Sequence, residues 1–94
     1  MKPENYKLAL RRARKAAKKI LEANDNIVFE ATDRKKHPVL VSIGRFSGLV
    51  RIIYICLETE RLQNITDDFL PWNIVQEIWV KQHSREGFKV IYHP

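Results

Sequence analysis

The stretch PVLVSIGRFSGLVRIIYICLE, residues 38–58, contains two apolar runs separated by the turn sequence GRFSG at positions 44–48. The second run, Leu49 to Leu57, carries Arg51 as its single charge. A short glycine-flanked turn between two such runs predicts an antiparallel β-hairpin. Because the second run is almost uncharged, it is expected to form a central strand that is buried on both faces of a sheet.

The segment that precedes this hairpin, 3–24, predicts a basic amphipathic helix. Pro3 suits a first helical turn, and no helix-breaking residue follows before Asn24. Apolar side chains recur at helical spacing within an arc of about 140°, and the alanines among them should let the helix lie close to a sheet. They are Tyr6, Ala9, Leu10, Ala13, Ala16, Ala17, Ile20 and Leu21. The opposite side is basic and holds Lys7, Arg11, Arg12, Arg14, Lys15, Lys18 and Lys19.

The remaining segments complete an α+β pattern. Alternation around Ile27 and Phe29 predicts another strand, so residues 26–58 are expected to form a three-stranded meander. The connecting segment, 59–73, contains Thr66-Asp67-Asp68, which indicates the start of one short helix. Residues 74–93 are expected to form a C-terminal hairpin. The sequence therefore predicts one domain, with the basic helix packed on a five-stranded mixed, largely antiparallel sheet.

The composition restricts the setting in which this protein works. Cys56 is the single cysteine of the 94 residues, so neither an intrachain disulfide nor a cysteine zinc cluster is expected. The histidines lack zinc-ligand spacing, and no apolar run reaches the roughly 18 residues that a membrane span needs. The N-terminus also lacks the apolar core of a signal peptide. These features favour a cytoplasmic protein.

The positive charge of the chain is concentrated at its start. Residues 1–24 hold eight basic and two acidic side chains, whereas residues 25–94 hold nine of each sign, so the helix segment carries the whole net charge of +6. This asymmetry predicts salt-sensitive, non-specific contact with the phosphates of DNA or RNA. The basic loop Arg34-Lys35-Lys36 is expected to extend that surface. A merely solvated helix face is the alternative, although such faces usually interleave both signs.

Two tripeptides of the meander suggest a family. Pro38-Val39-Leu40 opens the second predicted strand, and Tyr54-Ile55-Cys56 lies in the third, with Tyr54 fourteen positions after Leu40. Together with the order of elements, they resemble the PD-(D/E)XK, restriction-endonuclease-like nuclease fold in its small archaeal and bacterial, junction-resolvase-like members. In that family the corresponding tripeptides are P-x-D and (D/E)-x-K.

The resemblance implies a metal-dependent nuclease in which the two acids bind a divalent ion and the lysine assists the nucleophile. In this chain Leu40, Tyr54 and Cys56 stand at those positions, and none of them replaces a carboxylate or a lysine. We therefore expect a degenerate scaffold without catalytic residues, metal or cofactor, which binds nucleic acid without cleaving it. A displaced metal site remains open, and its candidate ligands are Glu22, Glu30, Asp33 and Glu58.

Two other functions remain open. The protein is alternatively a structural or interaction subunit that binds an acidic protein or forms a homodimer, for which the final strand, Val90-Ile91-Tyr92, offers a sheet edge. A further alternative is a metal-independent ribonuclease, because some basic residues are similar to those of the small bacterial toxins of the RelE/ParE type. These residues are Arg51, Arg61, His83 and Arg85.

Overall fold

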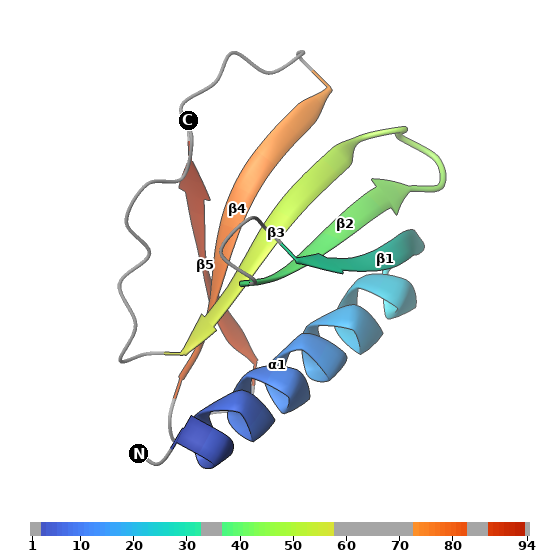
Figure 1. Cartoon of the computed structure of the whole chain (residues 1–94). Helices are drawn as coiled ribbons and strands as arrows, with labels where there is room; N and C mark the ends of the chain where they lie inside the picture. Colours follow the sequence, from blue (N-terminus) through green and yellow to red (C-terminus); the bar gives the residue numbers. More distant parts are fainter. Residues whose placement is uncertain (1–2, 33–36, 58–72, 83–86, 94) are drawn as a thin grey trace.

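The chain folds as one N-terminal helix packed on a five-stranded sheet, as the computed structural model shows (Figure 1). The structure describes residues 3–32, 37–57, 73–82 and 87–93. The elements are α1 (Pro3–Ala23), β1 (Asn26–Thr32), β2 (Pro38–Gly44), β3 (Val50–Leu57), β4 (Ile74–Lys81) and β5 (Phe88–His93). The predicted α+β class is confirmed. The short helix predicted within 59–73 lies outside the described residues.

The strands lie side by side in the order in which they occur along the chain, β1-β2-β3-β4-β5. Three of the four neighbouring pairs are antiparallel, and β3 pairs with β4 in parallel. The sheet is therefore mixed and largely antiparallel, as predicted. The strand from the 38–58 hairpin, β3, is central, while β1 and β5 are the outer strands of the described sheet.

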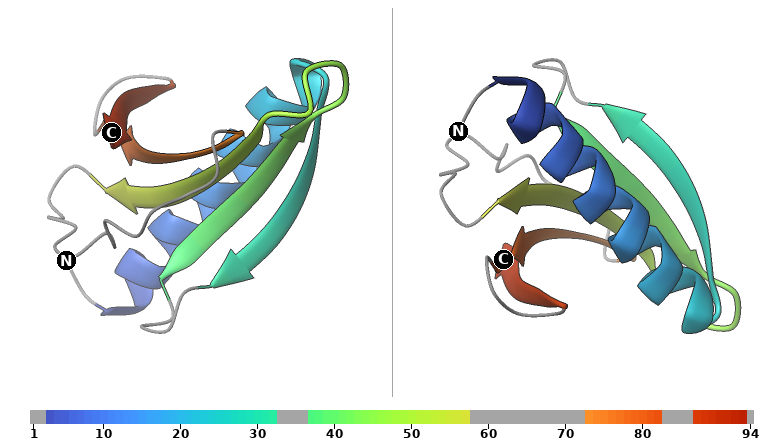
Figure 2. Two further views of the ribbon diagram at one scale, coloured as in Figure 1. Left: turned by 90° about the horizontal axis from the view of Figure 1, so that it is seen from above. Right: turned by 90° about the horizontal axis from the view of Figure 1, so that it is seen from below.

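The helix crosses one face of this sheet (Figure 2). Its buried strip consists of Leu10, Ala13, Ala17 and Leu21, and the strip packs on a cluster of side chains from β2, β3 and β4. That cluster contains Leu40, Ile53, Ile55, Leu57 and Trp79. Ala17 is 0% exposed, so the predicted close approach of helix and sheet is confirmed. Ile20 departs from the prediction, because its side chain lies beyond the edge of the buried strip and is 39% exposed.

The pairing of β2 with β3 decides which side chains face the helix. Leu40 pairs with Ile53, and both belong to the helix-packed core, whereas Val39 pairs with Tyr54 on the opposite face. The C-terminal half of β3 is buried on both faces, since Ile55 and Cys56 are 0% and 2% exposed. Its first residues, from Val50 to Ile52, are only partly buried. The prediction of a fully buried strand is therefore wrong at this end, where Arg51 lines a cavity rather than the core.

Candidate nucleic-acid interface

The predicted basic side of the helix is exposed to solvent. Packing of the apolar strip against the sheet turns the opposite side of α1 outward, because residues on one side of a helix recur every three or four positions. Lys7, Arg11, Arg12, Lys15 and Lys19 are exposed, whereas Arg14 and Lys18 are partly buried at the margin. We call these seven residues the basic face of α1.

The charges of the basic face are only slightly compensated. Arg14 Nε lies 3.9 Å from Glu30 Oε1 of β1, and both side chains are partly open to solvent, at 25% and 44%. An ion pair of this length and exposure contributes little. Within the described parts of the chain, the five exposed members of the basic face have no carboxylate partner. Their positive charge is therefore directed at solvent. Arg34, Lys35 and Lys36 lie outside the described residues.

The three positions of the nuclease-like motif do not meet at one site. Leu40 is completely buried beneath α1, in the hydrophobic core. Tyr54 and Cys56 follow the opposite alternation on β3, so they lie on the face turned away from the helix. The β2–β3 hairpin thus uses these positions for packing on two separate faces.

The acidic residues considered for a displaced metal site are also apart where the structure describes them. Glu22 is exposed near the end of α1, and Glu30 lies on β1 beside Arg14. Asp33 and Glu58 lie outside the described residues. Among the residues that can be placed, no three metal-ligating side chains come together. His37 has a structural contact instead, with its Nε2 atom 2.6 Å from the carbonyl oxygen of Ile55.

Comparison of this chain with protein-family models, with curated proteins and with solved structures finds no match.

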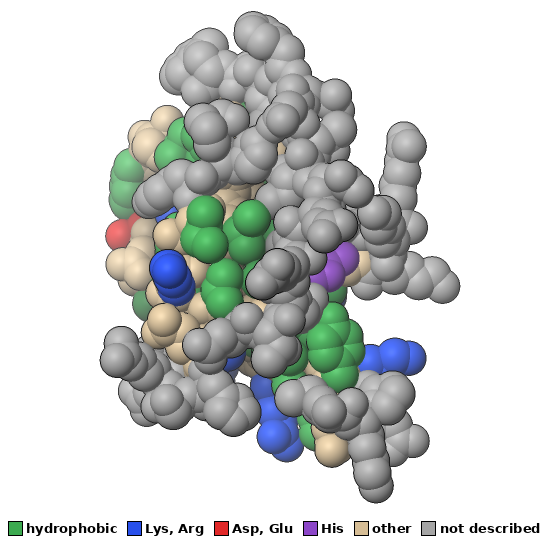
Figure 3. Space-filling view, turned by 90° about the vertical axis from the view of Figure 1, so that its left-hand side faces the viewer, with side chains coloured by type: hydrophobic (Ala, Val, Ile, Leu, Met, Phe, Trp, Pro, Cys, Tyr) green, Lys and Arg blue, Asp and Glu red, His purple; other side chains and the backbone are tan. Residues whose placement is uncertain are grey.

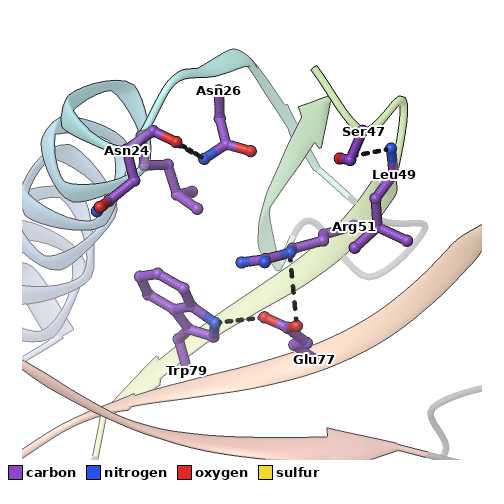
Figure 4. Close-up of polar contacts among 8 residues, drawn as sticks. Asn24, Asn26, Ser47, Leu49, Arg51, Glu77 and Trp79 are labelled. Carbon is purple, nitrogen blue, oxygen red and sulfur yellow. Dashed lines mark hydrogen bonds and ion pairs between the residues drawn. The ribbon is translucent and has the colours of Figure 1, made fainter. Parts of the chain in front are cut away.

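A polar cluster that sequence reasoning missed lies on the helix side of the sheet (Figure 4). Glu77 of β4 is only 2% exposed. Its Oε1 atom accepts a hydrogen bond of 2.9 Å from Trp79 Nε1, and its Oε2 atom lies 3.8 Å from Arg51 Nε of β3. The cluster satisfies a buried carboxylate from two sides, which such a group requires.

Ser42 adds an unsatisfied group next to this cluster. It is the register partner of Arg51 on β2 and is fully buried, and its hydroxyl has no hydrogen-bond partner in the described part of the chain. The signal for the cluster was present in the sequence. Arg51 is the single charged residue of the apolar strand β3, and Glu77 lies between apolar residues within β4, and opposite charges in such positions indicate a pair.

A cavity of about 410 Å³ opens beside Arg51, between the C-terminal end of α1 and the β2–β3 turn. Ile20 and Leu21 form its helix wall, the turn 44–47 forms its rim, and Arg51 and Trp79 form its floor. Residues 24–26, between α1 and β1, also line the cavity, which is open to solvent. Figure 4 shows Arg51 extending from β3 toward the helix end, above Trp79 and Glu77. The cavity thus joins a cationic group to apolar and aromatic surfaces.

Within the described residues, no helix is long and apolar enough to cross a membrane.

Proposed function

We propose that this protein is a non-catalytic nucleic-acid-binding module of the cytoplasm, in which the basic face of α1 contacts the phosphates of DNA or RNA. The observation that carries the proposal is the row of exposed cations from Lys7 to Lys19 without described carboxylate partners. The row extends over about 18 Å of helix. A duplex presents one negative charge per ~1.7 Å of its axis, so this length faces on the order of ten phosphate charges.

The scaffold assigned by the proposal is a degenerate PD-(D/E)XK nuclease. The described elements, α1, the meander β1–β3 and the closing pair β4–β5, are in the order on which that resemblance rests, and the short helix of that order falls outside the described residues. Leu40 supports the loss of cleavage, because a leucine enclosed in the core offers no oxygen to a metal. A scaffold of this kind retains a surface that binds nucleic acid but lacks the residues that would cleave it.

Salt dependence tests the electrostatic mechanism directly. If about five phosphates are neutralised, the affinity for duplex DNA should fall about 500-fold between 50 and 200 mM salt, because each contact releases bound counterions. Fluorescence anisotropy with one labelled DNA duplex and one RNA duplex measures this slope. The same samples with added magnesium should remain intact on a denaturing gel.

Two results would contradict the proposal in different ways. An affinity that is insensitive to salt, or no binding at 50 mM salt, would reject the contact with phosphates. Magnesium-dependent cleavage would leave binding in place and reject the non-catalytic scaffold.

A second candidate function is self-association through a sheet edge, and exposed apolar side chains favour it. Ile27 and Phe29 of β1 are 44% and 54% exposed, and both point away from α1 on an outer strand. Val90 and Ile91 of β5 are 37% and 43% exposed. Figure 3 views the molecule from the β5 side and shows apolar side chains reaching its surface. Such residues on an edge strand indicate pairing with another chain.

Replacing Phe29 by glutamate should convert a β1-mediated dimer into a monomer. A charge at this position would be buried against the second copy, whereas in the monomer the side chain lies mostly in water. Sedimentation velocity at several protein concentrations measures the change. Ile91→Glu on β5 is the matched control, and loss of the dimer in that variant alone would assign the contact to β5 instead. A wild-type protein that remains monomeric at high concentration would exclude this second function.

The described residues give no support to the alternative of a metal-independent ribonuclease. Of the four residues on which it rests, Arg51 lies beside Glu77, and Arg61, His83 and Arg85 lie outside the residues that the structure describes.

A further inference from the structure

We propose that the cavity beside Arg51 binds one nucleoside monophosphate, with the phosphate on Arg51 and Arg45 and the base against Phe46. This site is separate from the basic face of α1, and a free nucleotide or the phosphorylated end of a strand would present the same chemistry to it. The cavity volume of about 410 Å³ is within the range of small-molecule sites, which extends from roughly 300 to 1,000 Å³. The inference does not rest on nucleic-acid binding by α1.

Arg51 is held in position for an anion. Its Nε atom faces the Glu77 carboxylate, whose other oxygen accepts the hydrogen bond from Trp79. The Arg51 side chain is nevertheless 35% exposed and lines the cavity, and its terminal Nη groups have no partner among the described residues. The planar guanidinium donates paired hydrogen bonds to phosphate oxygens. Because Glu77 already orders the side chain, little conformational entropy is lost when an anion binds.

The rim of the cavity is equally well fixed. The backbone N–H of Arg45 donates to the carbonyl of Asp25 at 3.0 Å, which connects the turn to the residues that follow α1. Within the turn, the N–H groups of Gly44 and Gly48 donate to Leu49 and Gly44 carbonyls, each at 3.0 Å. Gly48 has a φ of +69°, which glycine adopts without strain.

Phe46 is the exposed aromatic side chain of this ordered turn. It lines the rim of the cavity and is 89% exposed, so its ring is left almost entirely in water. A base can stack on such an exposed aromatic ring, and its position on an ordered turn beside the cationic Arg51 suits a nucleotide.

The polar groups on the helix side select the base. The side-chain amide nitrogen of Asn24 donates to the Ile20 carbonyl at 2.8 Å, and that of Asn26 donates to the Leu21 carbonyl at 3.0 Å. Both residues line the cavity, and because their amide nitrogens are engaged at the helix end, their side-chain oxygens are the acceptors that remain for a ligand. Acceptors favour a base with an exocyclic amino group, such as adenine, over uracil.

The charges that line the cavity limit the ligand to a single phosphate. Arg45 and Arg51 are positive and Asp25 is negative, and Glu77 lies behind Arg51. The surroundings are therefore close to neutral, and the attraction comes from direct hydrogen bonds rather than from a strong field. We expect adenosine triphosphate to bind no more tightly than the monophosphate.

Titration of the ¹⁵N-labelled full chain with adenosine monophosphate (AMP) tests the site. Saturable shifts are expected at the amides of 44–49 and at the indole N–H of Trp79, which Trp79→Phe identifies. Phe46→Ser should weaken binding at least about fivefold, as the loss of stacking requires. Adenosine and uridine monophosphate should both bind more weakly than AMP. Arg51→Lys retains a positive charge beside Glu77 but lacks the planar fork, and it should also weaken binding.

The variants separate a local effect from unfolding. Phe46 is on the surface, so Phe46→Ser should leave the remaining spectrum unchanged, and Lys89→Ser on β5 is a surface control that should retain wild-type affinity. Saturation without dependence on Phe46 would overturn the assignment, as would shifts confined to α1. Absence of saturable shifts up to about 10 mM AMP would also reject the site.

A second arm distinguishes the two sources of the phosphate. Short single strands with a 5′-phosphate or a 5′-hydroxyl are titrated into the chain carrying Arg11→Glu, Lys15→Glu and Lys19→Glu, in which helix binding is suppressed. Shifts at the turn with the phosphorylated strand alone support the site and identify a strand end as a source. Binding of AMP without either strand supports the site and identifies a free nucleotide. If α1 does not bind nucleic acid, the AMP titration still tests the cavity, so the two proposals can be rejected independently.

Discussion

Duplex binding should fall roughly 500-fold at about 0.1 M salt when Arg11, Lys15 and Lys19 of the basic face are replaced together by glutamate. Each phosphate contact that is lost removes about 0.9 decades of affinity at this salt concentration. The three residues are exposed and lie one turn apart along α1. Glutamate is a good helix former, so the fold should persist in the variant. Anisotropy titrations measure the affinity, and circular dichroism checks the fold.

The slope of the salt dependence supplies a second measurement on the same variant. It should decrease in magnitude from about 4.5 to about 1.8 as the number of neutralised phosphates falls from five to two. Lys15→Glu and Lys89→Glu form a matched pair, because both residues are exposed and both changes alter the net charge equally. An equal loss of affinity in the two single variants would mean that net charge, rather than the surface of α1, drives binding. Retained affinity in the triple variant would remove α1 from the interface.

Glu77→Ala should destabilise the protein by about 3 kcal/mol, the largest effect that we expect from a single substitution. The change leaves the buried indole N–H of Trp79 without an acceptor and opens a void beneath α1. Arg51 loses its partner, but its partial exposure to water limits that contribution. Urea denaturation measures the free energy of unfolding, and the Tm should fall by more than about 10 °C.

Two companion variants test the origin of this effect. Glu77→Gln keeps the size of the side chain and an oxygen acceptor for Trp79, so its effect should be clearly smaller than that of alanine. Combining Arg51→Met with Glu77→Leu refills the void but still leaves the Trp79 N–H without an acceptor, so only part of the lost stability should be recovered. A free energy of unfolding for Glu77→Ala within about 0.5 kcal/mol of wild type would contradict a structural role for the carboxylate.

The parts of the fold that could be predicted are those encoded by local spacing. The helix was expected at 3–24 and forms at Pro3–Ala23, and residues 38–57 form β2, its turn and β3. The exposure of Ile20 and the partial burial of Arg51 could not be predicted in this way. Both depend on the cavity left between α1 and the turn, which is a property of the assembled layers.

The candidate sites also differ in whether local spacing along the sequence predicts them. The basic face follows from helical periodicity alone, so its exposed members could be named from the sequence. The Arg51–Glu77 contact joins two strands whose parallel pairing is not a local property. The separation of Leu40 from Tyr54 follows from the register of the hairpin, because a shift by one residue exchanges the two faces. The sequence separation between Leu40 and Tyr54 does not determine that register.

The parallel pairing of β3 with β4 also bears on how the chain reaches its native state. Val50 pairs with Ile43 across the tight turn, but its other partner, Ile74, is 24 positions further along the chain. Long-range pairs of this kind form late, because the entropy of closing the loop is lost before the contacts between the strands can compensate for it. The Arg51–Glu77 contact joins β3 and β4, the two strands that pair late. It therefore stabilises the step in which the β4–β5 hairpin docks onto a helix and meander that can assemble from local contacts.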